Sequence, residues 1–276
     1  MAWKPVGAHA GFHEALYEGV PAWMKTPLDF WAHTQLPNLQ RYVVPFDSAS
    51  RSAQPVAGGT WRGISGLLAT LGEERFVEFL DFVVYVSLSD DDPIQHLYDP
   101  EVAESLEELL VANGSAWRVG SRDGQPGLER RVPRGVQDAA DTVMGASGEA
   151  GHLLSESWHA AFGVSPNPEE AYEKAIKAVE AAGVAVVAPG NGVATLGTML
   201  ATMRDQGNWA LELADADGSL FTNLVVDMCQ ALWKGQPSRH GGNGYRKPTQ
   251  GEAEAAVLLA VPLVQWFVSG AIARRP

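Results

Sequence analysis

The sequence predicts a mainly α-helical protein, in which a C-terminal helical bundle follows a helical N-terminal region with one small β-hairpin. Three observations lead to this fold class. Apolar residues recur at helical spacing over most of the chain after Thr60. Residues that typically begin or end helices stand at the borders of these segments. A strand-like pattern is confined to a single stretch near residues 116–132.

The N-terminal region begins with a segment, residues 1–60, that is rich in proline, glycine and aromatic residues. We expect this segment to be largely irregular and anchored on a helical core, with short helices at 11–18 and 27–34. Beyond it, two apolar stripes predict two regular helices: Ile64, Leu67 and Leu68, then Phe76, Phe79, Leu80, Val83 and Val84. The acidic triplet before Pro93 is interpreted as a solvated helix end rather than a metal site. A further helix is expected at 101–112.

The predicted hairpin consists of residues 115–119 and 128–132, which flank a turn-rich stretch at 121–127. Five arginines give it a mildly basic surface, which we interpret as a solubilising face: Arg118, Arg122, Arg130, Arg131 and Arg134.

Six helices are predicted in the remainder of the chain, at 135–144, 148–162, 168–182, 195–204, 219–234 and 249–273. Asn167 and Pro168 form a good N-cap followed by proline at the first helical position. Small residues between the first two helices mark the expected domain boundary, which divides the chain into 1–146 and a helical bundle at 147–276. Four or five helices with short connections are typical of a bundle.

Composition and charge narrow the functional classes. The 276 residues are 46% hydrophobic, enough for a sizeable core, and the net charge of −13 disfavours nucleic-acid binding outside a local basic region. A single cysteine, Cys229, excludes an internal disulfide and suits a reducing cytoplasm. We therefore expect a cytoplasmic protein without a disulfide-linked partner. The charge-free run 255–273 could span a bilayer by length, but Pro262 and Gln265 favour a buried helix and no membrane association.

The sequence contains no convincing signature of a cofactor or metal, and none is expected. The glycine-rich stretch 189–192 lacks the lysine and hydroxyl of a phosphate loop. His9 and His13 lack the glutamate that follows the first histidine of zinc proteases. His152, Glu156 and His159 would share one helix face and could bind a transition metal, although pairing of Glu156 with His159 is the favoured interpretation.

One cluster remains as a candidate functional site. No acidic residue lies between Met228 and Gly251, and this acid-free segment contains Lys234, Arg239, His240, Asn243, Tyr245, Arg246 and Lys247. Arginine and lysine could hold a phosphodiester, and a histidine can transfer a proton near neutral pH. The alternative is a basic loop that balances nearby acidic helices.

Three features in order resemble the C-terminal helical domain of AbiJ-like abortive-infection proteins, which belongs to the HEPN superfamily. They are the segment 171–180 (AYEKAIKAVE), Thr195-Leu196-Gly197 with Met199-Leu200, and Arg239-His240-Gly241 before a final apolar helix. The hairpin also resembles the segment that precedes this domain, so the resemblance covers residues 75–273. It implies a dimeric helical bundle that acts in defence against phage, often as a metal-independent ribonuclease.

The resemblance assigns the acid-free segment specific roles. His240 would be the acid or base, Arg239 would steady the phosphate, and Lys234, Asn243, Arg246 and Lys247 would bind RNA. HEPN ribonucleases place four to six residues between the arginine and the histidine, whereas Arg239 and His240 are adjacent here. The sequence therefore does not decide whether the domain is catalytic. A non-catalytic helical module for dimerisation or interaction is the alternative function, and a helical metal-binding protein is a third.

Overall fold

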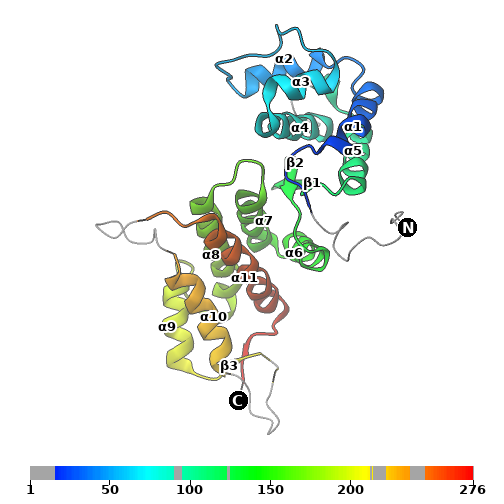
Figure 1. Ribbon diagram of the computed structural model, residues 1–276. Helices are drawn as coiled ribbons and strands as arrows, with labels where there is room; N and C mark the ends of the chain where they lie inside the picture. Colours follow the sequence, from blue (N-terminus) through cyan, green and yellow to red (C-terminus); the bar gives the residue numbers. More distant parts are fainter. Residues whose placement is uncertain are drawn as a thin grey trace. The chain divides into compact units, whose positions relative to one another are not determined.

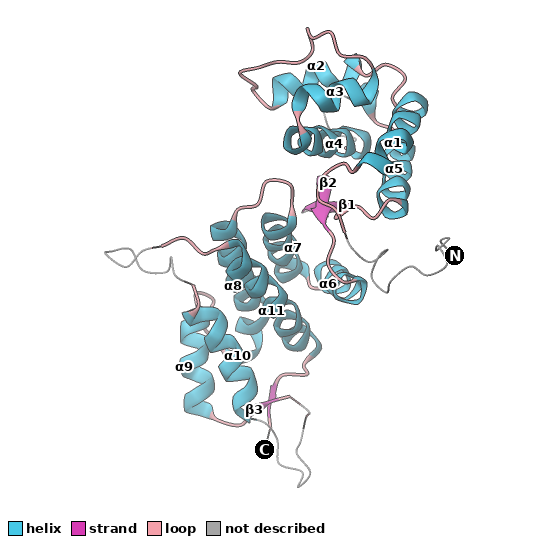
Figure 2. Cartoon of the chain, viewed as in Figure 1, coloured by secondary structure: helices cyan, strands magenta, loops and turns pink. Residues whose placement is uncertain are grey.

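The computed structural model describes residues 16–89, 95–122, 125–211, 213, 222–236 and 246–275. The chain divides into two compact units, Met1–Arg131 and Val132–Pro276. The described residues form eleven α-helices and two sheets of two strands each (Figures 1 and 2). The mainly α fold class is thus confirmed.

The first unit is built around one central helix, α4. Its helices are α1 (Ala22–Gln35), α2 (Gln40–Ala49), α3 (Gly63–Leu71), α4 (Glu73–Leu88) and α5 (Pro100–Ala112), with a short 3-10 helix at Gln95–Leu97. Helix α4 packs against α2, α3, α5 and the hairpin. Its predicted apolar stripe is fully buried, because residues three and four apart lie on the same helix face.

The N-terminal segment is more helical than the sequence indicates. Helix α1 begins before the predicted 27–34 helix, and α2 has no counterpart among the predictions. Both helices contain an internal proline, Pro27 or Pro45, which lacks the amide proton for a hydrogen bond inside the helix. Of the predicted helix 11–18, residues 16–18 are described and are not helical, because Tyr17 forms a parallel bridge with Ser115.

The hairpin is present and is longer than expected. Strand β1 (Trp117–Arg122) pairs with β2 (Gln125–Arg130), so most of the predicted turn 121–127 belongs to the strands. Carboxylates from two helices satisfy amides of these strands: Asp81 accepts from Leu128 N at 2.6 Å, and Glu107 accepts from Val119 N at 2.7 Å. These bonds offset the poor strand propensity of a glycine- and proline-containing sequence.

The second unit is a bundle whose centre is α8. Its helices are α6 (Arg134–Ala146), α7 (Gly148–Phe162), α8 (Pro168–Val187), α9 (Leu196–Gln206), α10 (Thr222–Lys234) and α11 (Gln250–Ser269). Helix α8 packs on α7, α9 and α11, while α6 packs on α7 and α11 (Figure 1). Asn167 caps α8 through Glu170 N at 3.3 Å, as predicted.

The structure moves two boundaries relative to the sequence. Helix α6 groups with the second unit because it packs on α7 and α11, so the division falls before this helix rather than at residue 146. Helix α11 ends at Ser269, where Gly270 adopts the left-handed conformation that often terminates helices. The chain then pairs β4 (Ala273–Arg274) with β3 (Trp209–Ala210).

Within the described residues, α11 is the one helix that is long and apolar enough to cross a membrane. Its inner face packs on α7 and α8, and eight of its residues are buried there: Ala253, Ala256, Val257, Ala260, Val261, Leu263, Val264 and Phe267. Helix α11 is therefore part of the bundle, as expected.

The close approach of α6 and α7 provides a stability test. A Cβ atom at Gly151 would clash with the backbone carbonyl of Met144, which no side-chain rotation can relieve. We expect Gly151→Ala to destabilise the fold by about 1–3 kcal/mol, measured by thermal unfolding. Gly145→Ala is the matched control, because its Cβ meets no atom within 4 Å in a helix. It should be neutral or stabilising, by up to about 1 kcal/mol. Equal effects of both variants would contradict this account.

Candidate functional site

The acid-free segment joins α10 to α11, and the structure describes both of its ends. Arg239, His240 and Asn243 lie outside the described residues. Lys234 is the exposed last residue of α10. Arg246 and Lys247 are exposed and lie shortly before the N-cap of α11, Thr249.

The first end of the segment is bound to the start of α8. The hydroxyl of the buried Tyr172 donates a hydrogen bond of 3.0 Å to the carbonyl oxygen of Leu232, in the last turn of α10. This carbonyl is one of the four that a helix end leaves without a partner inside the helix. Burial, and secondarily the charge of Glu252, raise the pKa of Tyr172 to about 12, so the phenol stays protonated as the donor. A Cβ at Gly235 would clash with the same hydroxyl, which allows no side chain there.

The second end is organised by Glu252. Thr249 and Glu252 form a capping box, in which each side chain accepts a hydrogen bond from the other residue's backbone amide. Glu252 also binds Arg246 through both carboxylate oxygens, at 2.6 and 2.7 Å. The Arg246 guanidinium, followed by the backbone amide of Thr249, lowers the pKa of Glu252 to about 2. Glu252 therefore stays ionised at any physiological pH.

Lys247 connects this second end to α8. Its ammonium lies 3.7 Å from the carboxylate of Glu169, in the first turn of α8. Both ends of the acid-free segment therefore meet the N-terminal turns of α8, the first through Tyr172 and the second through Glu169. The structure brings Lys234, Arg246 and Lys247 to one end of the second unit.

These ion pairs change the electrostatics that the sequence indicates. Arg246 presents its fork to Glu252, so a phosphate that bound this fork with two hydrogen bonds would have to displace the carboxylate. Lys247 is more available, because its side chain is 75% exposed and its ion pair is long. Lys234 is exposed at the end of a helix, where a cation is favourable. Lys234 and Lys247 are thus better placed than Arg246 to contact an anion.

The acidic and phenolic partners were absent from the sequence-based prediction. Glu252 could have been found, because threonine followed three residues later by glutamate before an apolar run is the sequence pattern of a capping box. Tyr172 and Glu169 could not, since only the tertiary fold brings α8 to these ends. Their sequence neighbours carry no sign of the contact.

The helix face of the alternative metal site also contacts α8. Glu156 forms an ion pair with Lys174 of α8, and its predicted pairing with His159 stays a prediction. Among the residues that the structure describes, no three His, Cys, Asp or Glu side chains gather in a way that could hold a metal ion. The helix face of His152 and Glu156 therefore has a structural use in joining α7 to α8.

Comparisons with known proteins add no assignment. No family model, no curated protein and no solved structure matches this chain. The resemblance to abortive-infection proteins therefore stays a prediction, and the candidate site depends on its own geometry.

The pKa of Glu252 predicts a pH-dependent stability. Its folded pKa, about 2, lies below its ordinary value of 4.5, so its stabilising contribution is complete above about pH 5. This contribution is lost as the pH falls towards 2. We expect the stability difference between wild type and Glu252→Gln, measured by urea unfolding, to be constant near neutrality and to shrink between pH 5 and pH 2. Glu149→Gln, in the first turn of α7, is the matched control. A difference for Glu252→Gln that does not vary with pH would refute the ion-pair interpretation.

Proposed function

We propose that this protein is an effector of the abortive-infection type, whose HEPN-like second unit acts on RNA through the segment between α10 and α11. The observation that supports this most is that both ends of the segment are bound at the N-terminal turns of α8. Arg239 and His240 stand between these two fixed points in the sequence.

In this proposal His240 carries the chemistry without a metal. A ribose 2′-hydroxyl would lose its proton to His240 as its oxygen bonds to the adjacent phosphorus. The P–O5′ bond would break, which leaves a 2′,3′-cyclic phosphate, and the departing 5′-oxygen would take a proton from water. Arg239 would hold the phosphate oxygens by paired hydrogen bonds. Lys234 and Asn243 would contact the neighbouring backbone, with Lys247 at the edge. The ion pair with Glu252 favours an anchoring role for Arg246 over the RNA contact that we first expected.

A second candidate function is supported by the same ion pairs. Because Arg246 and Lys247 already have acidic partners within the chain, the segment could be a structural element of a non-catalytic module that forms a homodimer or binds another protein. In that case the basic residues compensate for Glu169 and Glu252. The ribonuclease proposal and this one differ in whether RNA is bound or cut.

The two candidates are separated by an RNA cleavage assay in EDTA. If the proposal holds, purified protein cuts RNA in the presence of the chelator, and His240→Ala reduces the rate about 100- to 10,000-fold because proton transfer is lost. His152→Ala, at an exposed histidine of α7, is the matched control and should cleave normally.

RNA binding gives an independent measurement. Lys234→Ala should weaken binding and reduce the salt dependence by about one counterion, since each phosphate contact releases one. A stable dimer that neither binds nor cuts RNA at low salt would contradict the ribonuclease proposal and support the interaction module.

A further inference from the structure

The first unit contains a second region that is almost free of exposed acidic groups. Between Phe30 and Gly72 the one acidic residue is Asp47. Asp47 is buried, and its Oδ2 accepts hydrogen bonds of 2.7 Å from the backbone amides of Val56 and Ala57. The exposed charges of this stretch are therefore all positive: Arg41, Arg51 and Arg62. In a chain of net charge −13, these three exposed arginines are groups that attract an anion.

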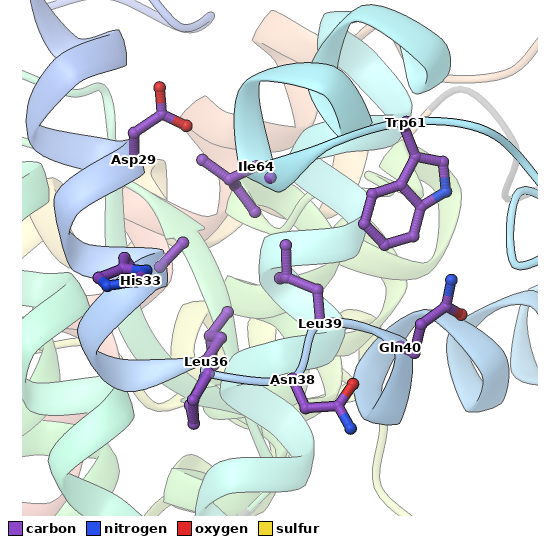
Figure 3. Close-up of a pocket in the computed structure, with 11 residues that line it drawn as sticks. Asp29, His33, Leu36, Asn38, Leu39, Gln40, Trp61 and Ile64 are labelled. Carbon is purple, nitrogen blue, oxygen red and sulfur yellow. The ribbon is translucent and has the colours of Figure 1, made fainter.

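A cleft of about 540 Å³ opens on this region, between α1, the start of α2 and the start of α3. Figure 3 shows His33 and Asp29 on one side, Trp61 and Gln40 on the other, and apolar side chains between them. Small-molecule sites commonly have this size, with an apolar base and a few polar groups.

Trp61 presents a fixed aromatic ring to the cleft. The indole N–H donates a hydrogen bond of 2.7 Å to the carbonyl oxygen of Val56, which orients the ring. Gly59 lies so close that a Cβ there would be 2.9 Å from Trp61 Cδ1. The ring is only half-buried and still lines the cleft. A pre-oriented, accessible indole is suited to stacking with a planar ligand.

The polar groups of the cleft differ in availability. Both carboxylate oxygens of Asp29 already accept hydrogen bonds within the chain, from Ser65 N at 3.1 Å and from Ser65 Oγ at 2.6 Å. Gln40 donates its amide N–H to the carbonyl oxygen of Ala57 at 3.2 Å, which leaves its Oε1 as an acceptor. Asn38 and His33 line the cleft with exposed side chains. Amides can both donate and accept, as recognition of a base edge requires.

A second groove adjoins the first at Gln40. It has a volume of about 710 Å³ and is lined by α2 and His96. Arg41 lies in this groove, and its guanidinium donates a hydrogen bond of 3.1 Å to the carbonyl oxygen of His96. Within the part of the chain that the structure describes, no acidic side chain forms an ion pair with Arg41. The cleft that Trp61 lines thus adjoins a groove that contains the guanidinium of Arg41.

We propose that the cleft of the first unit binds a nucleotide, with the base stacked on Trp61, its edge at Asn38 and Gln40, and the phosphate towards Arg41. The ligand is either a free nucleotide or one unit of a single-stranded RNA that continues along the second groove. This inference is independent of the function proposed for the second unit, because every residue that carries it belongs to the first unit.

The test is calorimetric titration of the full chain at low salt with AMP, adenosine and a four-nucleotide oligoadenylate. AMP should bind more tightly than adenosine because the phosphate adds the Arg41 contact. Trp61→Ala should weaken AMP binding about 10-fold or more, since base–aromatic stacking is lost. Trp61→Phe, which keeps a ring, should retain most of the affinity. Trp23→Ala and Arg51→Ala are matched controls outside the cleft and should bind as wild type does.

The outcomes separate the two sources of the ligand. If the oligonucleotide binds more tightly than AMP, and Arg41→Ala reduces the salt dependence of its binding, the ligand is RNA. If AMP binds as tightly as the oligonucleotide, the ligand is a free nucleotide. Gln40→Leu provides a second variant should Trp61→Ala fail to fold, and it should also weaken binding. The His240→Ala protein is titrated as well, to show whether nucleotide binding depends on the proposed site of the second unit. This variant should bind AMP as wild type does. Absence of AMP and oligonucleotide binding at millimolar concentration, or unchanged binding in both cleft variants, would overturn the proposal.

Discussion

The small residues on the buried face of α8 are the constraint on which the second unit depends. They are Ala171, Ala175, Ala178, Ala182 and Gly183. The distance between packed helices is set by the side chains at their contact, so these residues allow α7 and α11 to approach α8 closely. At Gly183 a Cβ would clash with the end of Met199 and lie 3.4 Å from Phe267. Larger residues on this face would separate the helices that hold the candidate site.

The polar residues of α8 then connect it to each neighbouring element. Lys174 pairs with Glu156 of α7, Glu180 accepts from Leu196 N at the start of α9, Tyr172 donates to Leu232 O of α10, and Glu169 pairs with Lys247 before α11. Helix ends leave amides and carbonyls without partners inside the helix, and α8 satisfies two of these ends with its own side chains. Helix α8 therefore contacts both described ends of the segment proposed to act on RNA.

The two acid-poor regions of the chain show why charge along the sequence and charge in space differ. Near α11, the basic residues Arg246 and Lys247 meet carboxylates from elsewhere in the fold, which reduces the positive field. Around the cleft of the first unit the opposite holds, because the acidic residue of the stretch, Asp47, is buried and bonded to backbone amides. Its charge lies inside, while the arginines stay on the surface. The carboxylate of Asp29, which lines the cleft, is the exception, and it accepts hydrogen bonds from Ser65.

The sequence by itself determined the mainly helical class, the hairpin, the central apolar stripes and caps such as Asn167, because these depend on periodicity and on contacts within a few residues. It did not predict α2 or the first part of α1, two helices in which tertiary packing outweighs the local cost of an internal proline. The sequence-based boundary falls after residue 146, whereas α6 groups with the second unit because it packs on α7 and α11. Only the tertiary structure decided that Glu169 pairs with Lys247 and that Trp61 faces a cleft. These arrangements join residues far apart in the chain, and a local pattern carries no information about such partners.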